Sequence, residues 1–185
     1  MVSLGKGMTQ KMKQILLMGN PNVGKSAVFN RVTGMNATQS NYPGTTIDYT
    51  KGHLRWDEED VEIIDVPGTF SLKPKDKAEE VAVKMLEKYR DSVVICILDA
   101  SKIGRGLYLA LEIIERGYPV VVALNMWDDV KTKKIHIDKD KLGSLLGVPV
   151  VPTVAVTGEG IGELVSKIWE TTNVTIEDLI ERVRS

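Results

Sequence analysis

Three observations predict a single α/β domain built on a mostly parallel sheet. Short apolar runs rich in valine and isoleucine alternate with amphipathic helical patterns along the chain. A glycine-rich loop follows the first run and precedes the first helical pattern. The length of 185 residues suits one domain and hardly allows two.

Four strand–helix pairs follow from this alternation. We expect strands at 15–18, 93–98, 120–124 and 148–154, each followed by a helix, at 26–32, 107–114, 142–146 and 161–169. A further helix at 78–89 has the apolar spacing i, i+3, i+4, i+7, i+8. Each helix is expected to bury one face against the sheet.

An antiparallel hairpin is expected between the first helix and the next parallel strand. Its strands, 49–56 and 61–65, flank the acidic turn 57–60. The predicted sheet therefore has six strands, mostly parallel, with one antiparallel edge strand and helices on both faces.

The two ends of the chain are interpreted separately from the domain at 14–171. Residues 1–13 lack the apolar centre of a signal peptide and are interpreted as an N-terminal extension or an expression scar. Residues 172–185 contain a predicted helix with Thr175 as its N-cap. This helix either docks on the domain or begins a following helical module.

Composition excludes several classes of protein. The net charge is -1, so no long-range field favours nucleic acid or an acidic membrane. No apolar stretch approaches the ~20 residues of a membrane span, so this segment is expected to be soluble. Cys96, the only cysteine, lies in an apolar run and is expected to be a buried core thiol in a reducing compartment.

The segment from Gly19 to Ser26 reads G-N-P-N-V-G-K-S and matches G-x-x-x-x-G-K-[ST] between a strand and a helix. The glycines let backbone N–H groups wrap a phosphate, and the helix N-terminus favours the same anion. Lys25 is expected to reach the β- and γ-phosphates, and Ser26 to bind Mg²⁺. The expected nucleotide contacts from this loop are Gly19, Asn20, Pro21, Asn22, Val23, Gly24, Lys25, Ser26 and Ala27.

A second motif ends the strand at 61–65. It reads D-V-P-G and consists of Asp65, Val66, Pro67 and Gly68. The carboxylate of Asp65 suits Mg²⁺, commonly through water, and the Gly68 N–H suits the γ-phosphate. The chain also matches D-x-x-G at 140–143, but that match lies in a helical pattern and is assigned to structure.

Guanine recognition is predicted from two further loops. Asn125, Met126 and Asp128 follow the strand 120–124 as N-M-W-D. The carboxylate of Asp128 can accept the N1–H and the amine of guanine, whereas adenine would leave it unpaired. Backbone N–H groups of a second loop, which reads T-V-A-V, are expected to meet the guanine oxygen; its candidates are Thr153, Val154 and Ala155.

The polar segment 41–46, N-Y-P-G-T-T, lies where the first switch loop of a GTPase belongs. Thr46 is the expected ligand of Mg²⁺ and the γ-phosphate, and Gly44 and Thr45 are expected near the nucleotide. Thr45 competes with Thr46 for the metal, and spacing alone does not separate them.

Together these motifs predict a Ras-like P-loop GTPase fold that binds GTP or GDP with Mg²⁺. They closely resemble FeoB-type ferrous iron transporters over about 15–169. The segments that carry this resemblance read N-P-N-V-G-K-S, N-Y-P-G-T-T, D-V-P-G-T-F-S-L, L-D-A-S…G-L-Y-L-A-L-E and V-V-A-L-N-M-W-D.

The resemblance implies a GTPase domain on the cytoplasmic face of the inner membrane. A helical module would join it to the membrane domain that moves Fe²⁺, both in the same polypeptide, and a homo-oligomer is open. The alternatives are a ribosome- or tRNA-associated GTPase resembling Era, Der and MnmE, and a non-catalytic switch.

The expected catalytic residues are Lys25, Asn22, Thr46 and Gly68. Thr69 stands where small signalling GTPases have the glutamine that positions water, and it is too short for that role. The resemblance to potassium-activated members implies that Asn22 helps to hold a K⁺, and that hydrolysis is slow and K⁺-stimulated. The alternative for Asn22 is a side chain that stabilises the turn.

Other features are assigned to structure. His53 and His136 lack partners at metal-ligand spacing, and the acidic turn 57–60 is interpreted as solvated. Lys131, Lys133 and Lys134 make a weak footprint for RNA, so no nucleic-acid partner is favoured.

Overall fold

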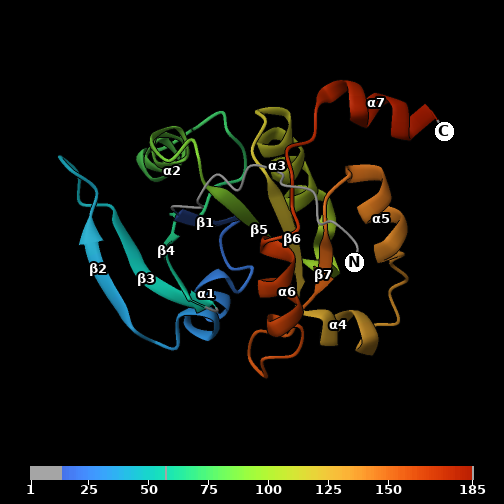
Figure 1. The fold of residues 1–185 in the computed structure, drawn as a ribbon, viewed down its shortest axis with the longest axis horizontal. Coiled ribbons are helices and arrows are strands. Elements are labelled where there is room, and N and C mark those ends of the chain that lie inside the picture. The colour runs from blue at the N-terminus through green and yellow to red at the C-terminus, as the bar shows by residue number, and fades with distance from the viewer. Residues whose placement is uncertain (1–13, 57, 185) are drawn as a thin grey trace, which may run out of the picture.

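The computed structural model describes residues 14–56 and 58–184. Its elements alternate along the chain as the sequence predicts, and Figure 1 shows their arrangement. The strands are β1 (Gln14–Gly19), β2 (Ala37–Asn41), β3 (Asp48–Trp56), β4 (Glu59–Asp65), β5 (Val93–Asp99), β6 (Val120–Asn125) and β7 (Val150–Pro152). The helices are α1 (Lys25–Thr33), α2 (Lys77–Lys88), η1 (Ala100–Lys102), α3 (Ile103–Glu115), α4 (Trp127–Thr132), α5 (Lys139–Leu146), α6 (Ile161–Ile168) and α7 (Ile176–Arg184).

The strands form one sheet in the order β2-β3-β4-β1-β5-β6-β7. The five strands from β4 to β7 are mutually parallel, and β3 runs antiparallel to both of its neighbours. The predicted α/β class is confirmed, but the expected count of six strands is wrong. The seventh strand, β2, takes the edge, so the antiparallel strand lies one position further in.

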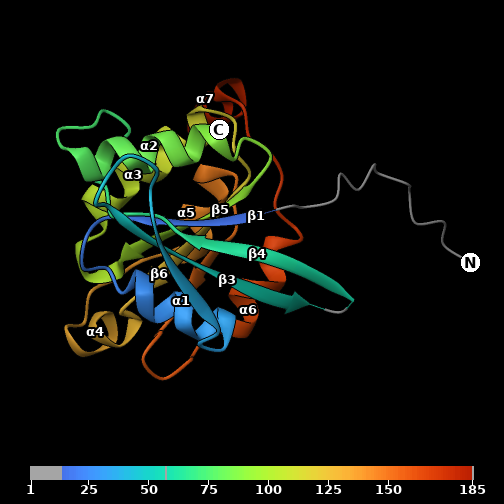
Figure 2. The same cartoon turned by 90° about the vertical axis from the view of Figure 1, so that its left-hand side faces the viewer.

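The sheet separates two apolar layers. Alternate residues of β1 point to opposite faces, so Leu16 and Met18 pack with α2 and α3, whereas Ile15 and Leu17 pack with α1 and α6. Figure 2 shows the sheet between these two pairs of helices. Strands β1, β5 and β6 are buried on both faces, which explains their continuous apolar sequences.

Several element boundaries differ from the expected ones. Strand β7 spans only Val150–Pro152, where a strand over 148–154 was expected, and a turn in which the Thr157 N–H donates to Val154 O at 3.1 Å follows it. Helix α4 is unexpected; it begins after Met126, whose φ of 59° places it in the left-handed region. The second D-x-x-G match, at 140–143, lies inside α5, as the structural assignment requires.

The C-terminal helix α7 begins with the predicted cap. The N–H of Asp178 donates to Thr175 Oγ1 at 3.2 Å, and the N–H of Thr175 donates to Asp178 Oδ2 at 2.9 Å. Arg182 donates to the carbonyl of Ser144 in α5 at 3.2 Å, so the helix docks on the domain. The interpretations of residues 1–13 and of Asp57 in the acidic turn lie outside the described residues.

Over the ranges that the structure describes, no helix combines the length and the apolar character that crossing a membrane requires. Cys96 lies in β5 and is fully buried, as expected from its apolar surroundings.

Burial raises the pKa of the Cys96 thiol to about 12. The thiol therefore stays protonated at pH 8, and we expect iodoacetamide to leave the folded chain unlabelled and to label it in guanidinium chloride. Mass spectrometry of both samples measures this difference. Labelling of the folded chain at the rate of the unfolded chain would contradict the burial of Cys96.

Candidate functional site

Four loops meet at the carboxyl ends of neighbouring parallel strands. The P-loop (residues 19–26) follows β1, the D-V-P-G segment ends β4, and the two predicted guanine loops follow β6 and β7. In an open parallel sheet this edge is where ligands bind. The strand order therefore brings together the motifs that the sequence predicts to share a site.

The phosphate side of the site gathers three polar groups. The ammonium of Lys25 contacts Asp65 Oδ1, and Ser26 Oγ lies 3.4 Å from Asp65 Oδ2. The side chains of Lys25 and Asp65 are only 12% and 10% exposed. A hydroxyl and a carboxylate oxygen this close together are ligands that suit Mg²⁺. The residues present therefore fit the expected magnesium ion.

The side chain of Asn125 fastens the P-loop to the loop after β7. Its Nδ2 donates to the carbonyl of Val23 at 2.9 Å. Its Oδ1 accepts from Thr153 Oγ1 at 3.2 Å and from the Ala155 N–H at 3.0 Å. Asn125 is buried, so these bonds act where water cannot replace them. Asn125 thus positions the loops, whereas Asp128, three residues further along, is exposed.

Glycine is the one residue type that position 24 allows beside the Asn125 amide. Its φ is 84°, in the left-handed region, and a Cβ there would lie 2.2 Å from Asn125 Nδ2. The glycine of the motif therefore makes room for the Asn125 amide as well as shaping the phosphate loop.

The loop after β7, residues 153–159, offers fewer free N–H groups than expected. The N–H of Thr153 donates to Leu124 O at 2.9 Å, that of Val154 to Glu159 O at 3.0 Å, and that of Ala155 to Asn125. The next N–H, of Val156, has no partner within the described part of the chain. Val156 is therefore the residue of this loop whose backbone is free to meet a ligand.

Thr69, in the position of the missing glutamine, is fully buried. Its hydroxyl donates to Ser71 O at 2.7 Å, and its N–H donates to Gly19 O at 3.1 Å. The side-chain amide of Asn20, oriented to satisfy its neighbours, donates to Thr69 O at 3.0 Å and accepts from the Gly106 N–H at 3.3 Å. Thr69 and Asn20 therefore hold the protein together at this point, and Thr69 presents no side chain to a water.

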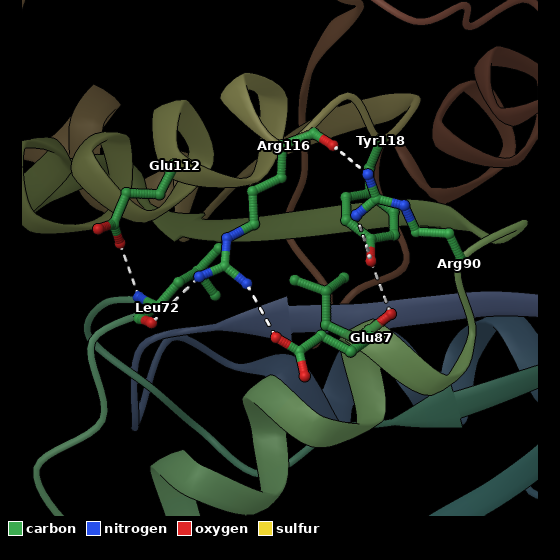
Figure 3. A network of polar contacts seen from close by, with 7 residues as sticks. Leu72, Glu87, Arg90, Glu112, Arg116 and Tyr118 are labelled. Carbon is green, nitrogen blue, oxygen red and sulfur yellow. Dashed lines mark hydrogen bonds and ion pairs between the residues drawn. The ribbon is translucent and has the colours of Figure 1, made fainter.

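The segment after Gly68, residues 69–76, is held by charged side chains of α2 and α3. Figure 3 shows Leu72 between Glu112 and Arg116: Glu112 accepts from its N–H at 2.7 Å, and Arg116 donates to its carbonyl at 3.4 Å. Arg116 also pairs with Glu87 of α2 at 3.5 Å. These contacts hold the segment against α2 and α3. No sequence motif predicts them.

The loop at 42–47 lies away from the P-loop. Figure 1 shows it at the far end of β2, beside α2. The hydroxyl of Thr45 donates to Tyr42 O at 2.9 Å and accepts from the Ile47 N–H at 3.2 Å, which closes a turn. Thr46 is exposed and makes no hydrogen bond to the residues that the structure describes. Gly44 lies in the same turn, so the structure does not bring these three residues to Ser26 and Asp65.

The features assigned to structure have ordinary surroundings. The exposed side chain of His53 faces Asp60 at 3.4 Å. Lys131 pairs with Glu159 at 2.9 Å and Lys133 with Asp129 at 2.7 Å. Within residues 14–56 and 58–184, no cluster of three His, Cys, Asp or Glu side chains could hold a metal ion.

Comparison with known proteins gives consistent matches. The family model described as ferrous iron transport protein B matches residues 13–168. A fusion of Fe(2+) transport protein A and the Fe(2+) transporter FeoB from Porphyromonas gingivalis is 41% identical over 153 residues, which is 82% of this chain and 18% of the relative. The Fe(2+) transporter FeoB of Leptospira biflexa is 39% identical over 155 residues, 83% of this chain and 22% of its own.

A solved structure gives the same answer. The G domain of the T. maritima FeoB iron transporter superposes with a TM-score of 0.80 at 38% identity, and the match covers 86% of this chain and 98% of that one. This chain spans only about a fifth of the length of the two curated relatives, 18% and 22%.

We expect Asn125→Ala to lower the unfolding free energy of the domain more than substitution of any single hydrogen-bonding partner of Asn125 does. The substitution leaves the Val23 carbonyl and the Ala155 N–H unpaired in the interior, which costs about 2–5 kcal/mol of unfolding free energy. Urea denaturation followed by circular dichroism measures it. The matched control, Thr153→Val, removes one of the three bonds and should cost about 1 kcal/mol. Equal losses in both variants would contradict the role of Asn125 as the common fastening.

Proposed function

The chain belongs to the ferrous iron transport protein B family, and we propose that it is the domain with which such a transporter binds and hydrolyses GTP. One observation carries the proposal: Lys25, Ser26 and Asp65 meet at the strand edge where Asn125 joins the P-loop to the guanine loops. The groups proposed to bind phosphate and those proposed to read guanine would thus share one site. The reaction is GTP plus water to GDP plus phosphate.

Phosphate binding would use the P-loop backbone, the N-terminus of α1 and Lys25. Lys25 would exchange its contact with Asp65 for the β- and γ-phosphates, which frees Asp65 to face the metal. Ser26, Asp65 and Thr46 would hold Mg²⁺. When bound, the ion neutralises negative charge on the phosphate oxygens.

Thr46 suits the metal better than Thr45 does. The hydroxyl of Thr45 is used twice within its own turn, whereas that of Thr46 is exposed. Because the loop lies beside α2, binding of GTP would have to draw Thr46 toward Ser26. We propose that this loop is the first switch and that it moves with the nucleotide state.

Guanine would be recognised from two sides. Asp128 stands in the first turn of α4, exposed and without an ion pair or hydrogen bond to the described residues, so its carboxylate can accept the N1–H and the amine. The Val156 N–H would donate to the guanine oxygen. Met126 stands where the common form of the motif, N-K-x-D, has lysine. Its thioether would rest against the base.

Hydrolysis would proceed without a glutamine. Thr69 is buried and bonded to Ser71, so the attacking water would depend on backbone groups at Gly68 and on Thr46. Asn22 has a φ of 64° and an exposed side chain that makes no hydrogen bond within the described ranges. It is therefore free to serve a K⁺ beside the phosphates, where the cation would supply positive charge to the transition state.

The relatives bear the name Fe(2+) transporter, and they are about five times longer than the match. We propose that the remainder of such a polypeptide supplies the membrane domain and the helical module that follows α7. This domain would then act on the cytoplasmic face of the membrane and regulate or drive iron uptake.

Asp128→Asn tests the guanine assignment. An amide can donate to the carbonyl that xanthine carries in place of the amine, so we expect GTP affinity to fall about 10- to 100-fold and the preference to shift toward XTP. Isothermal titration with GTP, XTP and ATP measures this shift. Unchanged GTP affinity in Asp128→Asn would contradict the assignment of Asp128 to guanine. Asp129→Asn is the control on the same helix.

Asn22→Ala tests the potassium assignment. We expect phosphate release under single-turnover conditions to be faster in KCl than in NaCl for the native chain, and the variant to lose that difference while binding GDP within about twofold of the native chain. Equal losses of GDP binding and of K⁺ stimulation would show that Asn22 has a structural role. No turnover above the buffer blank in either salt would refute the enzyme proposal.

A further inference from the structure

Arg31 lies on α1 and reaches the loop after β7. Its Nε donates to the carbonyl of Ala155 at 3.0 Å, and its Nη2 donates to the carbonyl of Val156. One guanidinium thus holds two consecutive peptide units, which its planar fork favours. These are 124 and 125 residues apart from Arg31 in the sequence.

The position of Arg31 links the two ends of the nucleotide site. It lies six residues after Lys25 on the same helix, and α1 begins with the phosphate-binding groups. The other end of the contact is the loop whose Val156 N–H is free. A helix that binds phosphate therefore also holds the backbone expected to meet the guanine oxygen.

The loop at 153–159 has two other ties of different kinds. Asn125 fixes its first half from β6, through Thr153 and Ala155. Lys131 of α4 pairs with Glu159 at its far end, with both side chains more than half exposed. An exposed pair of this kind contributes little. Only Arg31 holds the carbonyl of Val156 among the described contacts, and Val156 itself is 79% exposed.

We propose that Arg31 is a positioning residue for guanine: it holds the Ala155 and Val156 carbonyls so that the Val156 N–H stays aimed at the guanine oxygen, and it thereby sets how long GDP remains bound. The inference rests on the proposed function, because it assumes that a guanine nucleotide occupies this edge of the sheet. Arg31 itself touches no reacting group. Its loss changes nucleotide release, and hydrolysis of bound GTP continues.

The test compares Arg31→Ala with the native 185-residue chain by stopped-flow release of a fluorescent GDP. We expect release to accelerate about three- to tenfold, since two hydrogen bonds to a charged donor are lost from a partly exposed position. Single-turnover hydrolysis of bound GTP should stay within about twofold of the native rate. Arg31→Lys keeps the charge but cannot span two carbonyls, so it should release GDP nearly as fast as the alanine variant.

A change in the ligand separates positioning from simple loss of stability. In 6-thioguanosine diphosphate a sulfur, which is a weak acceptor, replaces the oxygen, while the groups that Asp128 reads are kept. The native chain should release this ligand faster than GDP, and Arg31→Ala should add little further acceleration. If Arg31→Ala accelerates both ligands equally, the effect is structural and the proposal is overturned.

Lys131→Ala is the matched control. It removes the same charge and a contact to the same loop, and release of GDP should be unchanged. Acceleration by Lys131→Ala as large as that by Arg31→Ala, or native release rates in Arg31→Ala, would refute the special role of Arg31. Failure of the native chain to bind GDP at all would instead refute the proposed function.

Discussion

The side-chain amide of Asn125 joins three segments that lie far apart in the sequence. Val23 belongs to the P-loop, Thr153 and Ala155 belong to the loop after β7, and all three bond to one buried amide. A buried amide left without partners is costly, so each segment holds the others in place. The same amide explains Gly24, because any side chain there would collide with it. The P-loop and the loop after β7 are therefore held together through Asn125.

The segment 69–76 and the loop at 42–47 are held differently from the loops that Asn125 joins. Carboxylates and a guanidinium on α2 and α3 hold the segment after Gly68: Glu79 accepts from the Phe70 N–H at 3.1 Å and the Lys75 N–H at 2.8 Å, and Glu112 accepts from Leu72. The 42–47 loop is closed mainly by its own turn. Such contacts can be exchanged for others without opening the apolar core, which agrees with the movement proposed for the loop at 42–47.

The elements that the sequence predicts best are the strands that are buried on both faces. The runs that became β1, β5 and β6 are buried on both faces, so their apolar composition announces them. Strand β2 escapes prediction because its sequence, A-T-Q-S-N, is polar and its side chains are largely exposed, so only backbone pairing with β3 defines it. The motifs likewise predicted that Lys25, Ser26 and Asp65 would meet, because strand order fixes their edge of the sheet.

Long-range polar contacts could not be predicted from the sequence. Arg31 and Glu112 look like exposed charges on amphipathic helices, and only the fold shows that each holds a backbone segment at least 40 residues away. The same holds for Thr69, whose hydroxyl could face either a ligand or its own loop until the bond to Ser71 is known. Sequence reasoning identifies which groups can do chemistry, whereas the fold decides which of them are already occupied.

The groups already bonded within the protein limit which groups of the proposed site can meet a ligand. In the loop at 153–159 six of the seven N–H groups are bonded within the protein, so in the proposed site the Val156 N–H and the carboxylate of Asp128 are the groups left to meet the base. Neither group is among those proposed to bind the phosphates. In the proposed site the base-reading groups and the phosphate-binding groups are therefore separate sets, and α1 links them because it carries Lys25 and Ser26 at its start and Arg31 further along. If Arg31 positions the loop at 153–159 as we propose, a substitution there changes how long GDP is held and leaves the contacts to the γ-phosphate in place.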